Sequence, residues 1–254
     1  MKIQYLSDMH LELSNNSRYF KDNYPEVTGD ILVIAGDTMY INQLVLNKFW
    51  EHCHINYKYT ILVPGNHEYY NYTDVSEYRS FKKNILGYDN VFYVNNQIVD
   101  IGEDIILICS TLWSEIPYQY YMETGWGLTD FKRIKYNNHI YNQDNYNDEH
   151  KYCLKFIKQC IDNIYDKKIV IVTHHMPSYT LGNPIYKGDA LNCCFATELY
   201  DYIERSPNIN AWIYGHSHYN HEDIMIGDTL VTCNQFGYYG ENNKSYNPIK
   251  FIEV

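Results

Sequence analysis

Short apolar runs, each ended abruptly by polar residues, mark the first third of the chain. Residues 3–6 and 60–63 have the length of strands, and residues 31–35 form a continuous apolar run, as a strand buried on both faces requires. Between the last two runs, residues 41–54 carry apolar positions at helical spacing. The order strand, helix, strand predicts parallel crossovers whose loops collect at one edge of a sheet.

The rest of the chain predicts further strands in both halves, with helices between them. Residues 73–86, 144–165 and 194–204 have helical spacing. Three short runs, at 91–94, 98–101 and 104–109, alternate with turn residues and predict antiparallel hairpins. The remaining strands are predicted at 169–172, 211–214, 222–226, 229–233 and 249–254. We expect one α/β domain over residues 1–254, with an irregular loop rich in Tyr and Asn at about 114–146.

Charge and cysteine content narrow the class of protein. The formal net charge is -11, so the surface repels polyanions and lacks the basic footprint of a nucleic-acid binder. The cysteines number 7, with no CxxC pair, and this indicates reduced thiols instead of a disulfide framework. No run is long enough to span a bilayer, and Asp8 interrupts the first apolar run. We therefore expect a soluble, cytoplasmic protein with no extended nucleic-acid partner and no membrane contact.

The residues that follow the predicted strands share the chemistry of metal ligands. Five strand ends carry Asp8 and His10, then Asp37, then Asn66 and His67, then His174 and His175, and finally His216 and His218. One histidine in a loop is ordinary, and we assign no such role to His52, His54, His139, His150 or His221. Five strand ends of the same kind are not expected by chance, and ligand sites in open α/β sheets lie outside the carboxyl ends of the strands.

Oxygen and imidazole ligands without thiolate favour divalent Mn, Fe or Zn over a structural zinc-cysteine site. The candidate ligands are too many for one ion, so two metal ions are predicted. A carboxylate between two such ions can bridge them, and a pair about 3.5–4 Å apart can hold a hydroxide and clamp phosphate oxygens during an in-line displacement.

These motifs, in this order, resemble the calcineurin-like metallophosphoesterase superfamily along nearly the full chain. The motifs are Asp8-x-His10, Gly36-Asp37, Gly65-Asn66-His67-Glu68, His174 and Gly215-His216-Ser217-His218. Further stretches are similar to a bacterial-type subfamily of small members with undefined substrates; they are Thr111-Leu112-Trp113, residues 130–134 and residues 237–241. The resemblance implies a four-layer α-β-β-α sandwich of two mixed β-sheets flanked by helices.

The resemblance also implies roles for the residues at the strand ends. One metal would be held by Asp8, His10, Asp37 and His218, and the other by Asp37, Asn66, His174 and His216, so that Asp37 bridges. His67 would contact the phosphate and protonate the leaving oxygen as general acid. His175 is expected to lie behind the ligands, as is Glu68, whose role the motif leaves open.

The function implied is hydrolysis of a phosphate monoester or diester by a metal-bridging hydroxide, with a small molecule or a phosphoprotein as substrate. Candidate substrate contacts are Arg133, Trp113 and Asn234, of which Arg133 could bind phosphate through two hydrogen bonds. The alternative is a non-catalytic scaffold that keeps the fold. Such a scaffold is expected to lose ligands or the acid histidine, and the sequence retains both.

Overall fold

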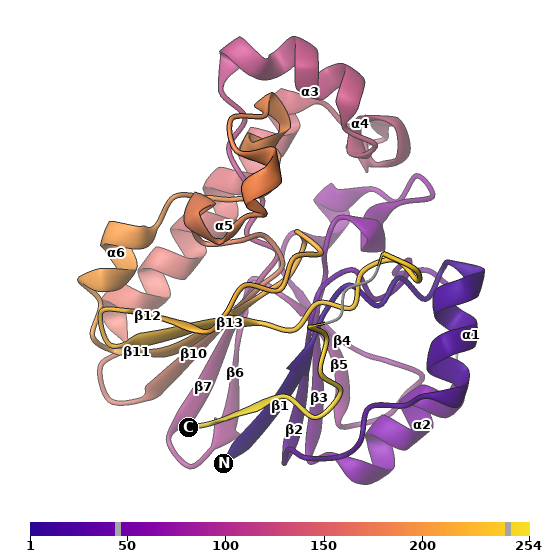
Figure 1. Ribbon diagram of the computed structural model, residues 1–254, viewed down its shortest axis with the longest axis vertical. Helices are drawn as coiled ribbons and strands as arrows, with labels where there is room; N and C mark the ends of the chain where they lie inside the picture. Colours follow the sequence, from indigo (N-terminus) through magenta and orange to yellow (C-terminus); the bar gives the residue numbers. More distant parts are fainter. Residues whose placement is uncertain (44–46, 242–244) are drawn as a thin grey trace.

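Two six-stranded β-sheets face each other and carry helices on their outer sides (Figure 1). The computed structural model describes residues 1–43, 47–241 and 245–254. The first sheet has the strand order β14-β1-β2-β3-β5-β4, and the second has the order β12-β13-β11-β10-β7-β6. In both sheets the central strands are parallel and the edge strands antiparallel. The predicted fold class, a four-layer sandwich with two mixed sheets, is confirmed.

The elements alternate along the chain. The strands of the first sheet are β1 (Lys2–Leu6), β2 (Ile31–Ala35), β3 (Tyr59–Val63), β4 (Phe81–Asn84), β5 (Val91–Asn95) and β14 (Phe251–Glu253). Those of the second are β6 (Gln97–Gly102), β7 (Ile105–Ser110), β10 (Lys168–Thr173), β11 (Ile209–Tyr214), β12 (Ile224–Ile226) and β13 (Thr229–Cys233), and β8 (Lys135–Tyr136) pairs with β9 (His139–Ile140). The α-helices are α1 (Ser14–Asp22), α2 (Asn47–Asn56), α3 (Tyr121–Gly127), α4 (Asp130–Arg133), α5 (Gln143–Asn163) and α6 (Tyr200–Glu204). The 3₁₀ helices are η1 (His67–Tyr69), η2 (Val75–Tyr78), η3 (Tyr118–Tyr120), η4 (Tyr179–Leu181), η5 (Pro184–Tyr186) and η6 (Ala190–Cys194).

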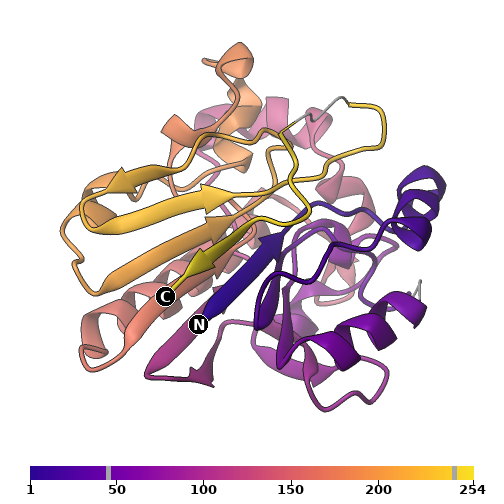
Figure 2. The same ribbon diagram turned by 60° about the horizontal axis from the view of Figure 1, so that its bottom comes forward.

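Strand β2 shows why its sequence is apolar throughout. Successive side chains of a strand point to opposite faces of the sheet. Ile31 and Val33 therefore belong to the core between the two sheets, whereas Leu32 and Ile34 pack in the layer that holds α1 and α2. Figure 2 shows the chain ends lying together, where β14 runs antiparallel to β1. Burial on both faces thus fixes the central strands.

The helix predicted at 73–86 is wrong. The segment folds as η2, in which the Asp74 carboxylate accepts a hydrogen bond from Ser76 N, followed by the edge strand β4. Tyr78, Phe81 and Ile85 still pack against the same hydrophobic cluster. Their spacing therefore predicted correctly that these side chains pack inward. It did not predict the secondary structure, because the segment pairs with β5 as an antiparallel strand.

The hairpins predicted across 91–109 are half correct. β6 and β7 form an antiparallel pair, but β5 lies in the other sheet, so the chain changes sheets at Asn95 and Asn96. Asn95 Oδ1 accepts the Thr111 N–H at 3.0 Å, and Asn96 Nδ2 donates to Arg79 O. These amides fix the crossover by bonding to the backbone of Thr111 and Arg79, which lie outside both strands.

The other helices differ from the expectations in their bounds. The helix predicted at 194–204 is observed only at its two ends, with Cys194 as the last residue of η6 and Tyr200–Glu204 as α6. Between them Phe195 O and Thr197 N–H bond to the backbone of Met176. The prediction at 41–54 is observed as α2 from Asn47 onward, and its residues 44–46 lie outside the described ranges. α1 is not among the predicted helices, since it buries only Asn16 and Phe20. The segment at about 114–146 contains η3, α3, α4 and the β8-β9 hairpin.

No helix in the described ranges has the length and apolar character that a bilayer crossing needs.

Candidate metal centre

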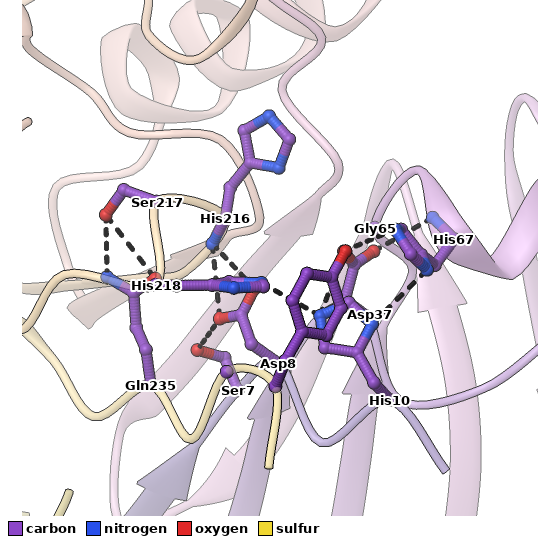
Figure 3. A network of polar contacts seen from close by, with 12 residues as sticks. Ser7, Asp8, His10, Asp37, Gly65, His67, His216, Ser217, His218 and Gln235 are labelled. Atoms are coloured by element: carbon purple, nitrogen blue, oxygen red, sulfur yellow. Dashed lines mark hydrogen bonds and ion pairs between the residues drawn. The ribbon is translucent and has the colours of Figure 1, made fainter. Parts of the chain in front are cut away.

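Loops from both sheets meet at the carboxyl ends of the parallel strands. β1, β2 and β3 lead into Asp8 with His10, Asp37, and Asn66 with His67, respectively; β10 leads into His174, and β11 into His216 with His218. Figure 3 shows His10, Asp37 and His67 approaching from the first sheet and His216 and His218 from the loop after β11. Strands in parallel place their ends at one edge, so residues distant in sequence become neighbours.

Asp8, His10 and His218 form the first group of candidate ligands. One donor atom of each lies within 4.8 Å of the other two. The Nε2 atoms of His10 and His218 are 2.9 Å apart, and His218 Nε2 lies 3.6 Å from Asp8 Oδ1. Asp37 Oδ2 is 3.8 Å from His10 Nε2. The arrangement brings two imidazoles and two carboxylates to one point, and this donor set suits a divalent cation.

Asp37, His174 and His216 form the second group, with donor atoms again within 4.8 Å of one another. Asp37 Oδ1 lies 3.3 Å from His174 Nε2. The side-chain oxygen of Asn66 is 3.2 Å from the same nitrogen. Asp37 therefore directs one oxygen to each group, which is the position that a bridging carboxylate requires.

Contacts behind the candidate ligands fix their orientation. His174 Nδ1 lies 3.0 Å from Ala35 O, and His218 Nδ1 lies 2.9 Å from Glu241 Oε2, so in both rings Nε2 faces the centre. Asn66 donates its amide N–H to Asp130 at 2.9 Å, which leaves the Asn66 oxygen directed at His174. Such outer partners set the tautomer and direction of metal ligands. Asp130 and Glu241 lie in stretches singled out in the sequence, but neither was expected there as a site residue.

The backbone is strained at most of the candidate ligands. Asp8, His10, Asp37, His216 and His218 have φ angles of 57°, 46°, 51°, 79° and 50°. Residues with a Cβ atom rarely adopt this left-handed region, at a cost of about 1–2 kcal/mol each. A strained conformation persists only where its surroundings enforce it, so the ligand positions are held firmly by the surrounding fold.

Glu68 supplies that enforcement at Asp37. Its fully buried carboxylate accepts N–H groups from Gly65 at 2.6 Å, Asp37 at 3.0 Å and Thr38 at 2.7 Å. Glu68 therefore links the loop after β2 to the loop after β3 through hydrogen bonds to the backbone of both. Burial and the charge of Asp37 raise the pKa of Glu68 to about 8, while the backbone donors act in the opposite direction.

His67 lies beside the ligands and bonds to Glu12. The Nδ1 atom of His67 is 2.7 Å from Glu12 Oε1, and its ring packs on Tyr70 with centroids 4.3 Å apart. Burial alone lowers the pKa of His67, but the charges of Asp37 and Glu12 outweigh it and raise the pKa to about 9. Sequence reasoning missed Glu12, although the period-two spacing Asp8-x-His10-x-Glu12 was the available signal.

The protonation of the cluster varies with its surroundings. Burial raises the pKa of Asp37, but His174 and His67 outweigh it and hold this pKa well below its usual range. Burial lowers the pKa of His10 and of His216, which favours the neutral imidazole that binds metal. His174 has its pKa lowered by burial and, more strongly, raised by Asp37, to about 9. Metal binding would therefore displace protons from part of the cluster.

A cavity of about 390 Å³ opens beside the centre and includes Asp37, Asn66, His67, His216 and His218 in its lining. The substrate contacts proposed from the sequence lie elsewhere. Trp113 is fully buried in a hydrophobic cluster, Arg133 donates to the Tyr40 hydroxyl at 3.0 Å, and Asn234 donates to Tyr5 O. These three side chains support the fold around the site and do not line the described cavity. His175 is also buried, with its ring 4.3 Å from that of His216.

Comparison with known proteins agrees with this geometry. The sequence model of calcineurin-like phosphoesterases matches residues 1–220. The chain belongs to the calcineurin-like phosphoesterase family. It is 30% identical over 277 residues to an uncharacterized protein of Acanthamoeba polyphaga mimivirus, covering 99% of this chain and 96% of the relative.

Solved structures align with most of the chain at low identity. Phosphopantetheinyl hydrolase from Mycobacterium tuberculosis aligns with a TM-score of 0.64 and 15% identity, over 93% of this chain and 89% of the hydrolase. A dimetal phosphatase from Danio rerio aligns with a TM-score of 0.49 and 11% identity, over 98% and 89% of the two chains. The fold class is therefore shared with the first of these enzymes.

Proposed function

We propose that this family member is a phosphoesterase with two metal ions, that it hydrolyses a phosphate monoester or diester, and that His67 is its general acid. The observation that carries the proposal is the position of Asp37, whose two oxygens face two separate groups of imidazole and oxygen donors. Membership of the calcineurin-like phosphoesterase family supports it.

The residues present fit a metal pair. Asp8, His10 and His218 would hold one ion and Asn66, His174 and His216 the other, with Asp37 shared. The Nε2 atoms of His10 and His218 are 2.9 Å apart, so one cation could bind both. The Asn66 oxygen faces His174 Nε2, so a second cation could bind these two atoms. Metal ions bound there would supply a nucleophile at neutral pH and stabilise negative charge on the phosphoryl oxygens. Mn, Fe and Zn all suit this donor set.

His67 is placed to give a proton to the leaving oxygen. Its Nε2 atom lies on the side of the cavity, 3.9 Å from Asp37 Oδ2, while Nδ1 bonds to the buried Glu12 carboxylate. Glu12 thereby fixes the ring orientation and stabilises the imidazolium form. A protonated imidazole at this position can neutralise the alkoxide as its bond to phosphorus breaks.

The test uses purified protein loaded separately with Mn, Fe and Zn and assayed on p-nitrophenyl phosphate, its bis ester and alkyl phosphates. The His67→Ala variant should lose about 10²-fold or more in kcat on alkyl phosphates, which need a proton on the leaving oxygen. It should lose far less on p-nitrophenyl phosphate, whose leaving group needs little protonation. Equal losses on both classes would remove the acid role from His67.

A non-catalytic scaffold is the competing function. It predicts that wild-type protein is inert with every metal on the whole panel, and that a partner captured by the protein stays bound after metal removal. That pair of results would overturn the phosphoesterase proposal.

A further inference from the structure

The cavity wall opposite the candidate metal centre is built by two segments that contact each other. The first, residues 127–130, ends α3 and begins α4; the second, residues 182–195, contains η5 and η6. They meet at Gly127, where a Cβ atom would lie 2.9 Å from Leu191 Cδ2. Figure 1 shows the α3-α4 region and the later segment together above the strand ends. We refer to these two segments as the wall.

The cavity lining includes apolar and aromatic side chains beside its polar ones. Leu128 and Leu191 line the cavity from the wall, and Tyr70 lines it beside His67. Phe195 stacks on the His216 ring at a centroid distance of 4.5 Å. Since His67 is the proposed acid, the alcohol part of a substrate would lie on its side of the cavity, beside Tyr70. Such surfaces bind apolar and aromatic groups by excluding water.

The charged residues that the cavity adds to the candidate centre are all carboxylates, namely Asp130, Asp189 and Glu241. Within the described ranges, no lysine or arginine lines the cavity. Lys132 bonds to Trp126 O at 2.7 Å, and the guanidinium of Arg133 bonds to Tyr40. The phosphate would meet the metal ions, but a second anionic group would meet carboxylates, with no lysine or arginine of the described lining to pair with.

We propose that the cavity selects phosphate esters whose alcohol part is apolar or aromatic and bears no further negative charge. Nucleoside triphosphates and phosphorylated carboxylic acids are then poor substrates, and a positively charged alcohol is accepted. This inference rests on the proposed phosphoesterase function and adds the substrate class to it.

The test compares three aryl phosphates that differ in the charge of the para substituent: 4-methylphenyl, 4-(aminomethyl)phenyl and 4-(carboxymethyl)phenyl phosphate. The metal-loaded wild type should cleave the carboxymethyl ester with a kcat/KM about tenfold or more below that of the methyl ester. The aminomethyl ester should match or exceed the methyl ester. Higher salt should reduce the difference, since screening weakens the repulsion.

Variants at Asp189 test whether the wall causes the discrimination between substrates of different charge. Asp189→Lys should raise the carboxymethyl-to-aminomethyl ratio of kcat/KM about tenfold. Asp189→Asn retains an oxygen for the Leu191 N–H, which Asp189 Oδ1 now accepts at 2.8 Å, and should shift the ratio in the same direction by less. Asp201→Lys on α6 changes the net charge equally, is exposed and lies outside the cavity lining, so it should leave the ratio unchanged.

Two outcomes would overturn the inference, and they can be told apart. Equal kcat/KM for all three esters, or the same ratio change in Asp201→Lys as in Asp189→Lys, removes the selection by charge while the phosphoesterase function stands. Failure to cleave any of the three esters with Mn, Fe or Zn overturns the function and the inference together.

Discussion

The candidate metal centre and the wall that faces it are built in opposite ways. The centre consists of short loops at the ends of buried parallel strands, with left-handed backbone at five candidate ligands. The wall consists of short helical turns, and large apolar side chains stay exposed on it and just before it in the chain, at Met122, Trp126 and Ile185. The first region is held by two sheets at once, whereas the second is held by side-chain contacts with segments that are distant in the sequence.

The two regions have different tasks: the centre holds candidate metal ligands, and the wall shapes the space for the substrate. Metal ligands must keep their geometry to a fraction of an ångström, so the strain at Asp37 is tolerable only because its buried partner Glu68 holds it. The wall shapes the alcohol part of a substrate, and its residues can change without disturbing the sheets. Substitutions in the centre should therefore affect chemistry and folding together. Substitutions in the wall should affect selection alone, except at Asp130 and Phe195, which contact candidate ligands.

The largest effect is expected at the residue shared by both ligand groups. Asp37→Asn removes the charge that faces both groups, so the bound metal should fall below one ion per chain and kcat/KM on p-nitrophenyl phosphate should fall by about 10³-fold or more. Elemental analysis and steady-state kinetics measure the two quantities. Asp201→Asn on the exposed face of α6 is the control. A variant with two metals and near-normal activity would contradict the shared role.

The next effect concerns the support beneath the ligand loops. Glu68→Gln places an amide N–H group against backbone N–H groups that now donate to the carboxylate. The free energy of unfolding of the metal-free protein should fall by about 3 kcal/mol, measured in urea. The exposed Glu77→Gln should change it by less than about 0.5 kcal/mol. Similar values for the two variants would show that the centre is no more tightly held than the surface.

The pH dependence of the metal-free protein tests the charge balance of the centre. Asp37 raises the pKa of both His67 and His174 to about 9, against burial that lowers it. A folded pKa above the unfolded value of about 6.5 gives stability that is complete below pH 6.5 and is lost as the pH rises through 9.

Between pH 6.5 and 9.5 the free energy of unfolding should therefore fall by on the order of 2–4 kcal/mol, since both rings share the Asp37 charge. Urea denaturation at each pH measures it, and His67→Ala should show a smaller fall. With saturating metal the trend should weaken or reverse, because the ligands bind metal as neutral imidazoles. A flat profile for the metal-free protein would contradict the assigned charges.

The sequence predicted the centre better than the wall for a physical reason. Strands buried on both faces, such as 31–35, must be apolar throughout, and the polar residue that ends each one is therefore conspicuous. Glu12 and Asp130 were missed as site residues because each acts by bonding to another side chain across the fold, at His67 and Asn66. Nor does local sequence encode the left-handed φ angles at the ligands, which the tertiary contacts impose.

The wall escaped prediction because its elements are too short to show periodicity. α4 and η6 bury side chains against distant segments, and their helical residues number 4 and 5. Arg133 illustrates the consequence: its charge suggested phosphate binding, but its guanidinium lies over the Tyr70 ring, 5.0 Å from the centroid, outside the cavity lining. The sequence shows the charge of Arg133, but it does not show the direction in which the side chain points.

The smallest effect is expected in the wall itself. Leu191 is half-buried and contacts Gly127, so Leu191→Ala should lower the free energy of unfolding by only about 1 kcal/mol and open the apolar surface of the cavity. The KM for 4-methylphenyl phosphate should rise about two- to fivefold, with metal content unchanged and kcat altered by less than about twofold. Leu230→Ala on β13 removes a half-buried side chain of the same type from the edge of the core between the sheets, so it should match the stability loss without changing KM. A large fall in kcat or in bound metal for Leu191→Ala would mean that the wall and the centre are coupled, and the division between chemistry and selection would have to be abandoned.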